Sequence, residues 1–167
     1  MDIYIREATK RDLSGILSLY SQPDLDDGQV LTTEHAEHVF EEMRRYPNYR
    51  VYVASHGSLV VGTFALLIMD NLIHHGKPSG ILEAVAVDPE FQRRGVGRQM
   101  IHFAMDRCRE FGCYKISLSS NFRLSKAHEF YDSLGFRRHG ISFVVDLVAE
   151  GGAIASTMDT SRPSNPN

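Results

Sequence analysis

Residues 85–98 read VAVDPEFQRRGVGR, and this stretch indicates how the centre of the chain folds. It places an apolar strand end, an Asp-Pro turn and a basic loop with Gly95 and Gly97 directly before a helical pattern. A helix start offers unpaired backbone N–H groups and the positive end of the helix dipole, and glycines let a bulky anion approach the backbone. The stretch therefore predicts a strand, a loop and a helix that together bind a phosphate or pyrophosphate.

Two familiar phosphate loops do not match this stretch. A Walker loop ends in Gly-Lys-Ser/Thr, and a dinucleotide fingerprint needs a third glycine where Met100 stands. Nucleoside triphosphates and NAD are therefore disfavoured as ligands. A tight left-handed turn with solvated arginines at positions 93, 94 and 98 is the alternative that needs no ligand.

The remainder of the chain predicts an α/β fold around this unit. Apolar runs of strand type alternate with segments of helical periodicity, and Thr9 with Asp12 forms a capping signal before the first helix. The order β-α-α-β-β-β-α-β-α-β indicates a mixed sheet that is antiparallel in its first half and contains a strand-helix-strand crossover. We expect strands at residues 3–5, 50–55, 59–69, 81–87, 114–119 and 142–148, and helices after Thr9, from about Thr33 to Pro47, from about Arg98 to Phe111, and from Lys126 to Leu134 with Ser125 as its cap.

Length and composition are those of one globular domain. The 167 residues can bury roughly 70% of the surface that the unfolded chain exposes. A content of 43% hydrophobic and 23% charged residues excludes wholesale disorder and a disulfide-dense miniprotein. From Ala149 onward the residues are small and polar, so we expect a domain over residues 1–149 and a flexible tail over residues 150–167.

Charge and apolar runs bear on partners and location. A net charge of −3, from 18 basic and 21 acidic residues, creates no general attraction to nucleic acid or anionic lipid, so we expect neither as a partner. No apolar run approaches the roughly 20 residues of a membrane helix. Residues 1–10 lack the features of a secretory signal, so we expect a cytoplasmic protein.

Metal and thiol chemistry find little support. Cys108 and Cys113 have no histidine or cysteine nearby at zinc-ligand spacing and are interpreted as buried free thiols. The adjacent side chains of His74 and His75 point in different directions on an extended chain, which is poor geometry for one ion. We therefore predict no metal site.

Two motifs resemble those of the GNAT superfamily of N-acetyltransferases. Gln92-Arg93-Arg94-Gly95-Val96-Gly97 resembles its acetyl-CoA pyrophosphate loop, Q/R-x-x-G-x-G/A, and residues 127–136, AHEFYDSLGF, resemble its late A-x-x-F-Y-x-x-x-G-F motif. The motifs occur in the right order with a helix and a strand between them, which is more specific than either alone. Residues 82–87 are similar to a strand of glucosamine-phosphate N-acetyltransferases, and residues 118–130 resemble aminoalkylphosphonate N-acetyltransferases.

The resemblance implies both a fold and a cosubstrate. The implied GNAT fold is a mixed, mostly antiparallel sheet of six to seven strands, flanked by four helices and splayed between the fourth strand (81–87) and the fifth (114–119). Acetyl-CoA is the implied cosubstrate, with its pantetheine arm in the gap bonded to the backbone of Val85 and Val87. The expected contacts are Val85, Ala86, Val87, Gln92, Arg93, Arg94, Gly95, Val96, Gly97, Arg98, Asn121, Lys126 and Tyr131.

Two of these assignments depart from the family's usual pattern. Many members carry an asparagine seven residues before the tyrosine, a position that Leu124 occupies in this chain. Asn121 stands three residues earlier, and Lys126 follows in the same stretch. Both are therefore expected cofactor contacts whose individual roles the sequence leaves open.

Tyr131 is the candidate general acid. It matches the family's tyrosine near the thioester sulfur, which gives a proton to the departing thiolate. The short helix by itself favours a different interpretation, in which Tyr131 is a core aromatic residue beside Phe130.

Glu83 is the candidate general base, acting on the amine through water. It is a charged residue within an apolar strand, and by alternation we expect it to share a face with Val85 and Val87. A carboxylate that faces solvent or pairs with an arginine is an equally good interpretation.

These observations predict an N-acetyltransferase that acts on a primary amine of a small molecule by direct attack in a ternary complex. Neither Cys108 nor Cys113 has a basic partner, which disfavours a covalent acetyl-cysteine. The alternatives are a non-catalytic acetyl-CoA-binding module and a protein or peptide N-acetyltransferase. The acidic residues 24–27 either attract a cationic amine or are simply solvated, and a homodimer that pairs through residues 143–148 stays open.

Overall fold

The computed structural model describes residues 1–23, 25, 28–145 and 147, which fall into two units, Met1–Phe136 and Arg137–Asn167. All helices and strands of the described residues belong to the first unit. The strands are β1 (Tyr4–Glu7), β2 (Tyr49–His56), β3 (Leu59–Met69), β4 (Ser79–Val87) and β5 (Lys115–Ser117), the helices are α1 (Leu13–Tyr20), α2 (Thr33–Arg45), α3 (Val96–Glu110) and α4 (Ser125–Asp132), and the 3-10 turns are η1 (Lys10–Asp12), η3 (His74–Gly76) and η4 (Pro89–Phe91).

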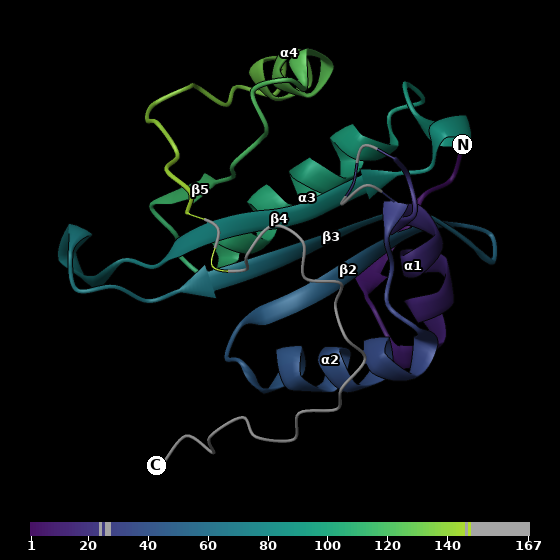
Figure 1. The fold of residues 1–167 in the computed structure, drawn as a ribbon. Coiled ribbons are helices and arrows are strands. Elements are labelled where there is room, and N and C mark those ends of the chain that lie inside the picture. Colours follow the sequence, from purple (N-terminus) through teal and green to yellow (C-terminus); the bar gives the residue numbers. More distant parts are fainter. Residues whose placement is uncertain (24, 26–27, 146, 148–167) are drawn as a thin grey trace. The chain divides into compact units, whose positions relative to one another are not determined.

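The strands form one mixed sheet in the order β1-β2-β3-β4-β5 (Figure 1). Neighbours from β1 to β4 are antiparallel, whereas β4 and β5 are parallel and joined through α3, as the sequence predicted. β4 pairs with β3 as far as Val87, but with β5 only from Ser79 to Ile81. The sheet therefore splays between its fourth and fifth strands, and this prediction is confirmed.

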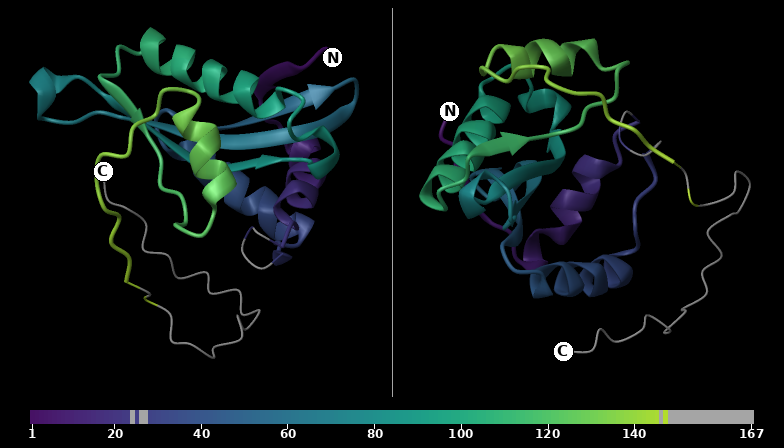
Figure 2. Two further views of the ribbon diagram at one scale, coloured as in Figure 1. Left: turned by 90° about the horizontal axis from the view of Figure 1, so that it is seen from above. Right: turned by 90° about the vertical axis from the view of Figure 1, so that its left-hand side faces the viewer.

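Helices cover the two faces of the sheet separately (Figures 1 and 2). The alternating side chains of β3 explain this division, because Phe64 and Leu66 pack with Met100 of α3, whereas Ala65 belongs to a second core cluster with Phe40 of α2. The first unit therefore has an α3 face and, on the opposite side of the sheet, a face covered by α1 and α2, which we call the α1/α2 face.

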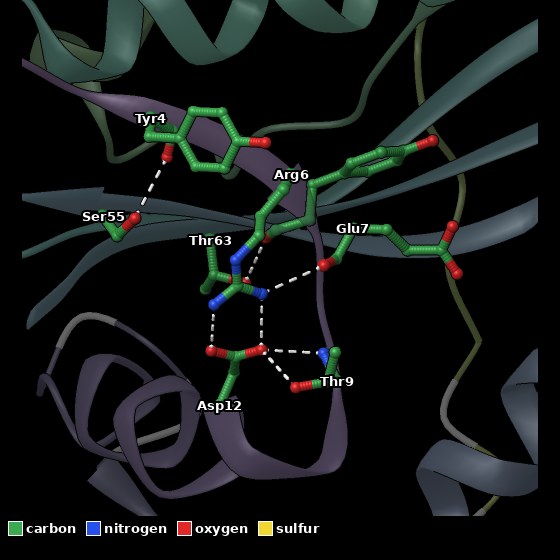
Figure 3. Close-up of polar contacts among 8 residues, drawn as sticks. Tyr4, Arg6, Glu7, Thr9, Asp12, Ser55 and Thr63 are labelled. Carbon is green, nitrogen blue, oxygen red and sulfur yellow. Dashed lines mark hydrogen bonds and ion pairs between the residues drawn. The ribbon is translucent and has the colours of Figure 1, made fainter. Parts of the chain in front are cut away.

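A partly buried ion pair joins β1 to the start of α1 (Figure 3). Both guanidinium NH groups of Arg6 donate to the Asp12 carboxylate at 2.7 Å, and Asp12 is only 6% exposed. The backbone N–H and the hydroxyl of Thr9 donate to the same carboxylate at 2.7 and 2.9 Å, which confirms the predicted capping signal. These hydrogen bonds, that from Arg6 above all, lower the pKa of Asp12 to about 2.

Two helix starts differ from the sequence prediction. α3 begins at Val96 because Gly95, with a φ of 88°, ends the loop in a left-handed conformation. α4 begins at Ser125 itself, with Leu124 in the capping position and no side-chain capping bond, so the assignment of Ser125 as the cap was wrong.

The predicted last strand at residues 142–148 is also wrong where the structure describes it. Residues 142–145 and 147 form no strand, so the described sheet has five strands rather than six to seven. The apolar run favours a strand, but a strand forms only against a partner, and Phe143 remains 91% exposed. The expected tail, 150–167, lies outside the described residues.

No helix among the described residues is long and apolar enough to span a membrane.

Candidate active site

The open edge of β4 lies at the centre of the candidate site. Beyond Ile81 the strand has no β5 residue paired with it, whereas its other edge stays bonded to β3. The carbonyl of Val87 accepts hydrogen bonds from Nε2 of Gln92 at 3.2 Å and from Nε2 of Gln22 at 3.4 Å. The end of the strand is therefore tied to the loop that follows it and to the segment after α1.

A bulge in β4 divides the residues that the sequence predicted to act together. Ala84 has a φ of 51°, and the register slips by one residue because Ala65 pairs with Glu83 whereas Thr63 pairs with Ala86. Glu83 therefore lies on the α1/α2 face with Ala65, while Val85 and Val87 pack against the core cluster of the α3 face. The expectation that Glu83 shares a face with Val85 and Val87 was wrong, because the extra residue reverses the alternation.

The loop between β4 and α3 has the backbone of an anion site. Arg93 and Gly95 have φ values of 58° and 88°, a conformation that turns successive N–H groups toward one side. Gly95 caps α3 without a side-chain bond, so the first-turn N–H groups stay available. The residues 92–95 and Arg98 are exposed.

The arginines of this loop differ in their contacts. Arg94 lies over the ring of Phe91, 5.7 Å from its centroid. Arg93 and Arg98 make no hydrogen bond or ion pair with any residue that the structure describes. Their charges are therefore not compensated within this part of the chain and can meet an anion.

Gly97 has a different role from the one its sequence position suggested. A Cβ atom at this position would lie 3.2 Å from Cζ of Phe130, so the missing side chain makes room for α4. Gly97 therefore allows α3 and the helix of Tyr131 to pack closely, and its backbone contact with acetyl-CoA stays a prediction.

Tyr131 lies on α4 among aromatic rings. Its ring centroid is 5.2 Å from that of Phe130 and 5.6 Å from that of Phe136, and the three pack against the core of the α3 face. Burial raises the pKa of Tyr131, so its hydroxyl keeps its proton at neutral pH. Among the described residues the hydroxyl has no hydrogen-bond partner. Core packing and a proton-donor role are thus compatible in this residue.

Glu83 faces solvent. Its side chain is exposed, and among the described residues it forms no ion pair with an arginine, which removes one of the two interpretations that need no catalysis. Burial raises the pKa of Tyr49, and the nearby Glu83 carboxylate raises it further. Glu83 and Tyr49 are therefore neighbours on the α1/α2 face.

A match to a protein-family model shows which family has these features. The model of the acetyltransferase (GNAT) family matches residues 13–136, which include the β4 edge, the loop and Tyr131. The chain belongs to the GNAT family. As a member of this family the protein is an N-acetyltransferase, and GNAT enzymes use acetyl-CoA as their acetyl donor.

Known GNAT proteins resemble this one over nearly their full length. Glucosamine 6-phosphate N-acetyltransferase of Trypanosoma brucei brucei is 30% identical over 149 residues, 88% of this chain and 97% of that protein. Aminoalkylphosphonate N-acetyltransferase of Salmonella typhimurium is 25% identical over 145 residues, 86% and 90% of the two chains. The crystal structure of a Trypanosoma brucei acetyltransferase superposes with a TM-score of 0.75 at 30% identity and covers 87% of this chain and 100% of that one.

Asn121 and Lys126 of this GNAT chain have separate surroundings. The Asn121 side-chain oxygen accepts from the N–H of Arg123 at 3.0 Å, and its carbonyl accepts from the N–H of Leu124 and lies 3.0 Å from Nε2 of His128. Asn121 therefore shapes the turn before α4. Lys126 has no hydrogen bond or ion pair with a described residue, so its contact with acetyl-CoA stays a prediction.

The sequence analysis missed the polar residues that border the bulge. The sequence analysis gave Tyr20 no role, yet its hydroxyl donates to the carbonyl of Ala84 at 3.3 Å. Burial raises the pKa of Tyr20 to about 12, and the Thr63 hydroxyl opposes this only in part. No spacing pattern relates Tyr20 to a strand 64 residues later, so only the fold reveals the contact.

A cavity of about 400 Å³ opens on the same face. It is bounded by α1, α2, Leu25, residues 29–31 and the strands β2, β3 and β4, which contribute Tyr49, Ala65 and Ala84 to its wall. The predicted role of Asp24, Asp26 and Asp27 in attracting an amine falls outside the described residues.

Proposed function

We propose that this GNAT enzyme transfers the acetyl group of acetyl-CoA to a primary amine of a small molecule, by direct attack in a ternary complex. The observation that carries the proposal is the unpaired edge of β4 beside the left-handed loop at the start of α3. An extended pantetheine arm can bond to such an edge as a neighbouring strand would, and the loop offers N–H groups and arginines to the pyrophosphate.

The donor contacts follow from this arrangement. Val85, Ala86 and Val87 lie on the open edge, and Gln92 to Arg98 follow within one loop and one helical turn. A backbone N–H of the edge would polarise the thioester carbonyl and stabilise the oxyanion that forms during attack.

Two side chains would move the protons. Glu83, exposed on the α1/α2 face, would accept a proton from the ammonium group through water and release the neutral amine. The amine nitrogen then bonds to the carbonyl carbon and gives up a second proton to solvent, and the carbon–sulfur bond breaks as the amide forms. Tyr131, whose pKa is raised by burial, would give its proton to the thiolate and regain one from solvent.

The cysteines support direct attack over a covalent intermediate. Burial raises the pKa of Cys108 to about 12, and it also raises the pKa of Cys113. Thiols with raised pKa values carry little thiolate at neutral pH and are poor nucleophiles.

The acceptor class rests on the relatives. Those that match most of this chain are named for glucosamine 6-phosphate and for aminoalkylphosphonates, which are small primary amines rather than protein N-termini. A small-molecule acceptor is therefore favoured over a peptide.

The homodimer stays a prediction with one supporting observation. Large apolar side chains at residues 141, 143–145 and 147 are 77–92% exposed. Side chains of this kind commonly mark an interface, and a second copy would cover them. Sedimentation of the full chain over a range of concentrations tests it, and a monomer at every concentration would contradict it.

Replacing Tyr131 tests the proposed function. We expect Tyr131→Phe to lower turnover roughly 10- to 1,000-fold while acetyl-CoA binding is retained, because only the proton donor is lost. The measurement is acetyl-CoA-dependent release of free thiol over a panel of amines, with binding followed by calorimetry. Tyr4→Phe, at an exposed residue of β1, is the matched control.

Two results would contradict the proposal. Unchanged turnover in Tyr131→Phe would remove Tyr131 from its role. Acetyl-CoA binding without thiol release by any amine would favour the non-catalytic binding module.

A further inference from the structure

The cavity on the α1/α2 face has an almost entirely apolar lining among the described residues. Among the described residues that line it, none carries a formal charge. Its polar side chains are limited to Tyr20, Gln29 and Tyr49, and the rest of the lining is aliphatic, aromatic or methionine. A volume of about 400 Å³ lies within the range of roughly 300–1,000 Å³ that is usual for small-molecule sites.

One end of this cavity touches the proposed site of transfer. Ala84, the bulged residue of β4, is part of its wall, and Ala65, the pairing partner of Glu83, is another part. Tyr49 lines the cavity, and the negative charge of Glu83 contributes to its raised pKa. Glu83 is not itself among the described lining residues, but it is next to Ala84 in β4 and paired with Ala65, so a ligand in the cavity would have a cationic group near that carboxylate.

Part of the cavity lining is an apolar rim that is open to water. Val30 and Leu31 precede α2, line the cavity and are 45% and 42% exposed. Large apolar side chains left open to water beside an apolar cavity gain free energy when an apolar ligand covers them.

We infer that this cavity holds the body of the acceptor, and that the acceptor is a primary amine on an uncharged, apolar body, aliphatic or aromatic. The inference rests on the proposed function and names its acceptor class. The amine would lie at the Glu83 and Ala84 end, and the apolar body would extend along α1 and α2 toward Leu31.

A phosphate or phosphonate group does not suit this lining. Moving a phosphate from water into a cavity without a cation or a sufficient set of donors is strongly unfavourable. No arginine, lysine or histidine is among the described lining residues, and Arg93 and Arg98, which have no partner among the described residues, lie in the loop before α3 and in the first turn of α3. This chain should therefore differ in acceptor from the relatives named for phosphorylated or phosphonate amines.

The test compares acceptors at saturating acetyl-CoA by thiol release. Phenethylamine and hexylamine represent the apolar class, and glucosamine 6-phosphate and 2-aminoethylphosphonate represent the anionic class. We expect kcat/KM for the apolar amines to be higher by at least roughly 10-fold, because one buried apolar group contributes about this factor. Higher values for the anionic amines would overturn the inference and leave the proposed function standing.

A pair of leucine variants locates the acceptor. Leu31→Gln removes half-exposed apolar contact from the cavity rim and should raise KM for phenethylamine roughly 3- to 10-fold with little change in kcat. Leu59→Gln is the control, because Leu59 is 52% exposed at the start of β3 and does not line the cavity. Val30→Gln repeats the test should Leu31→Gln fold poorly. Equal KM values in the Leu31, Val30 and Leu59 variants would overturn the assignment to this cavity.

A binding measurement separates this inference from the proposed function. If no amine raises thiol release, phenethylamine is titrated by calorimetry into the full chain in the presence of CoA. Binding that Leu31→Gln weakens and Leu59→Gln does not would uphold the inference although the proposed function fails. Absence of binding would overturn the inference as well.

Discussion

Two turns of this molecule lead from a strand into a helix and carry arginine, but they use it in opposite ways. At the turn from β1 to α1, Arg6 of β1 is bonded twice to a buried carboxylate, and Thr9 and Asp12 bond to each other in a capping box. At the turn from β4 to α3, Gly95 caps the helix without a side chain, and Arg93 of the loop and Arg98 of the first helical turn have no partner among the described residues.

The difference teaches how to separate a structural turn from a binding turn. Where the donors of a helix start are satisfied from within, as at Asp12, the turn contributes stability. Where donors and positive charges stay unsatisfied, as around Gly95, the turn contributes little stability and is open to an anion. Substitutions in the first turn should therefore change stability and not acetyl-CoA affinity, whereas substitutions in the second turn should change acetyl-CoA affinity.

The largest expected effect is on the first turn. Asp12→Ala removes the capping acceptor and the partner of Arg6, and we expect a loss of about 2–4 kcal/mol in the free energy of unfolding, with acetyl-CoA affinity unchanged. Denaturant unfolding and calorimetry provide the two readouts. Asp12→Asn, which keeps an acceptor but not the charge, should lose less. Equal stability of Asp12→Ala and the unmodified chain would contradict the structural role.

Acid should act on the same turn. The pKa of Asp12 is about 2 in the folded chain against 3.8 as its ordinary value, so its contribution is complete above about pH 4 and is lost as pH falls toward 2. The buried carboxylate should account for about 2 kcal/mol of this pH dependence. Unfolding curves between these pH values, compared with those of Asp12→Asn, measure it. Identical pH dependence in the two proteins would be incompatible with this prediction.

The second turn should respond in binding. Gly95→Asp places a carboxylate at the expected pyrophosphate position, and we expect acetyl-CoA affinity to fall roughly 30-fold or more. Gly112→Asp is the matched control. Gly112 follows the C-terminal end of α3 and has a φ of 71°, and a Cβ atom added there would meet nothing within 4 Å. Both variants should lose about 1–2 kcal/mol of stability from the left-handed conformation, but only the first should lose affinity. Similar affinities in calorimetry would refute the loop assignment.

The smallest expected effect comes from replacing a single arginine in each turn. Arg98→Ala should weaken acetyl-CoA binding roughly 3- to 10-fold without loss of stability, because it removes one charge-assisted contact from an exposed residue. Arg11→Ala, at an exposed arginine of the first turn, should change neither property. Equal acetyl-CoA affinities in Arg98→Ala and Arg11→Ala would contradict the predicted difference between the two turns.

The sequence predicted best those features that depend on local spacing. The capping box of Thr9 and Asp12, the antiparallel strands β2 and β3 and the crossover from β4 through α3 to β5 all arise from residues near one another in the chain. The loop before α3 was predicted for the same reason, because its glycines and arginines lie within seven consecutive residues.

Features that depend on contacts between distant segments were not predicted. The φ of 51° at Ala84 has no signal in an alternating apolar strand, and this single bulged residue moved Glu83 to the opposite face from Val85. The residues that line the cavity come from two helices, a loop and three strands, so no sequence motif predicts the cavity. Residues 142–145 have strand-forming composition without a described partner strand, and composition alone did not make a strand.

A titration of the full chain with acetyl-CoA, followed residue by residue through its backbone amide resonances, tests the central claim most directly. The account predicts that the largest shifts fall at Val85, Val87 and residues 92–98, while residues 6–13 of the first turn stay unchanged. Shifts confined to other segments, or a saturating titration that leaves residues 92–98 unmoved, would contradict it.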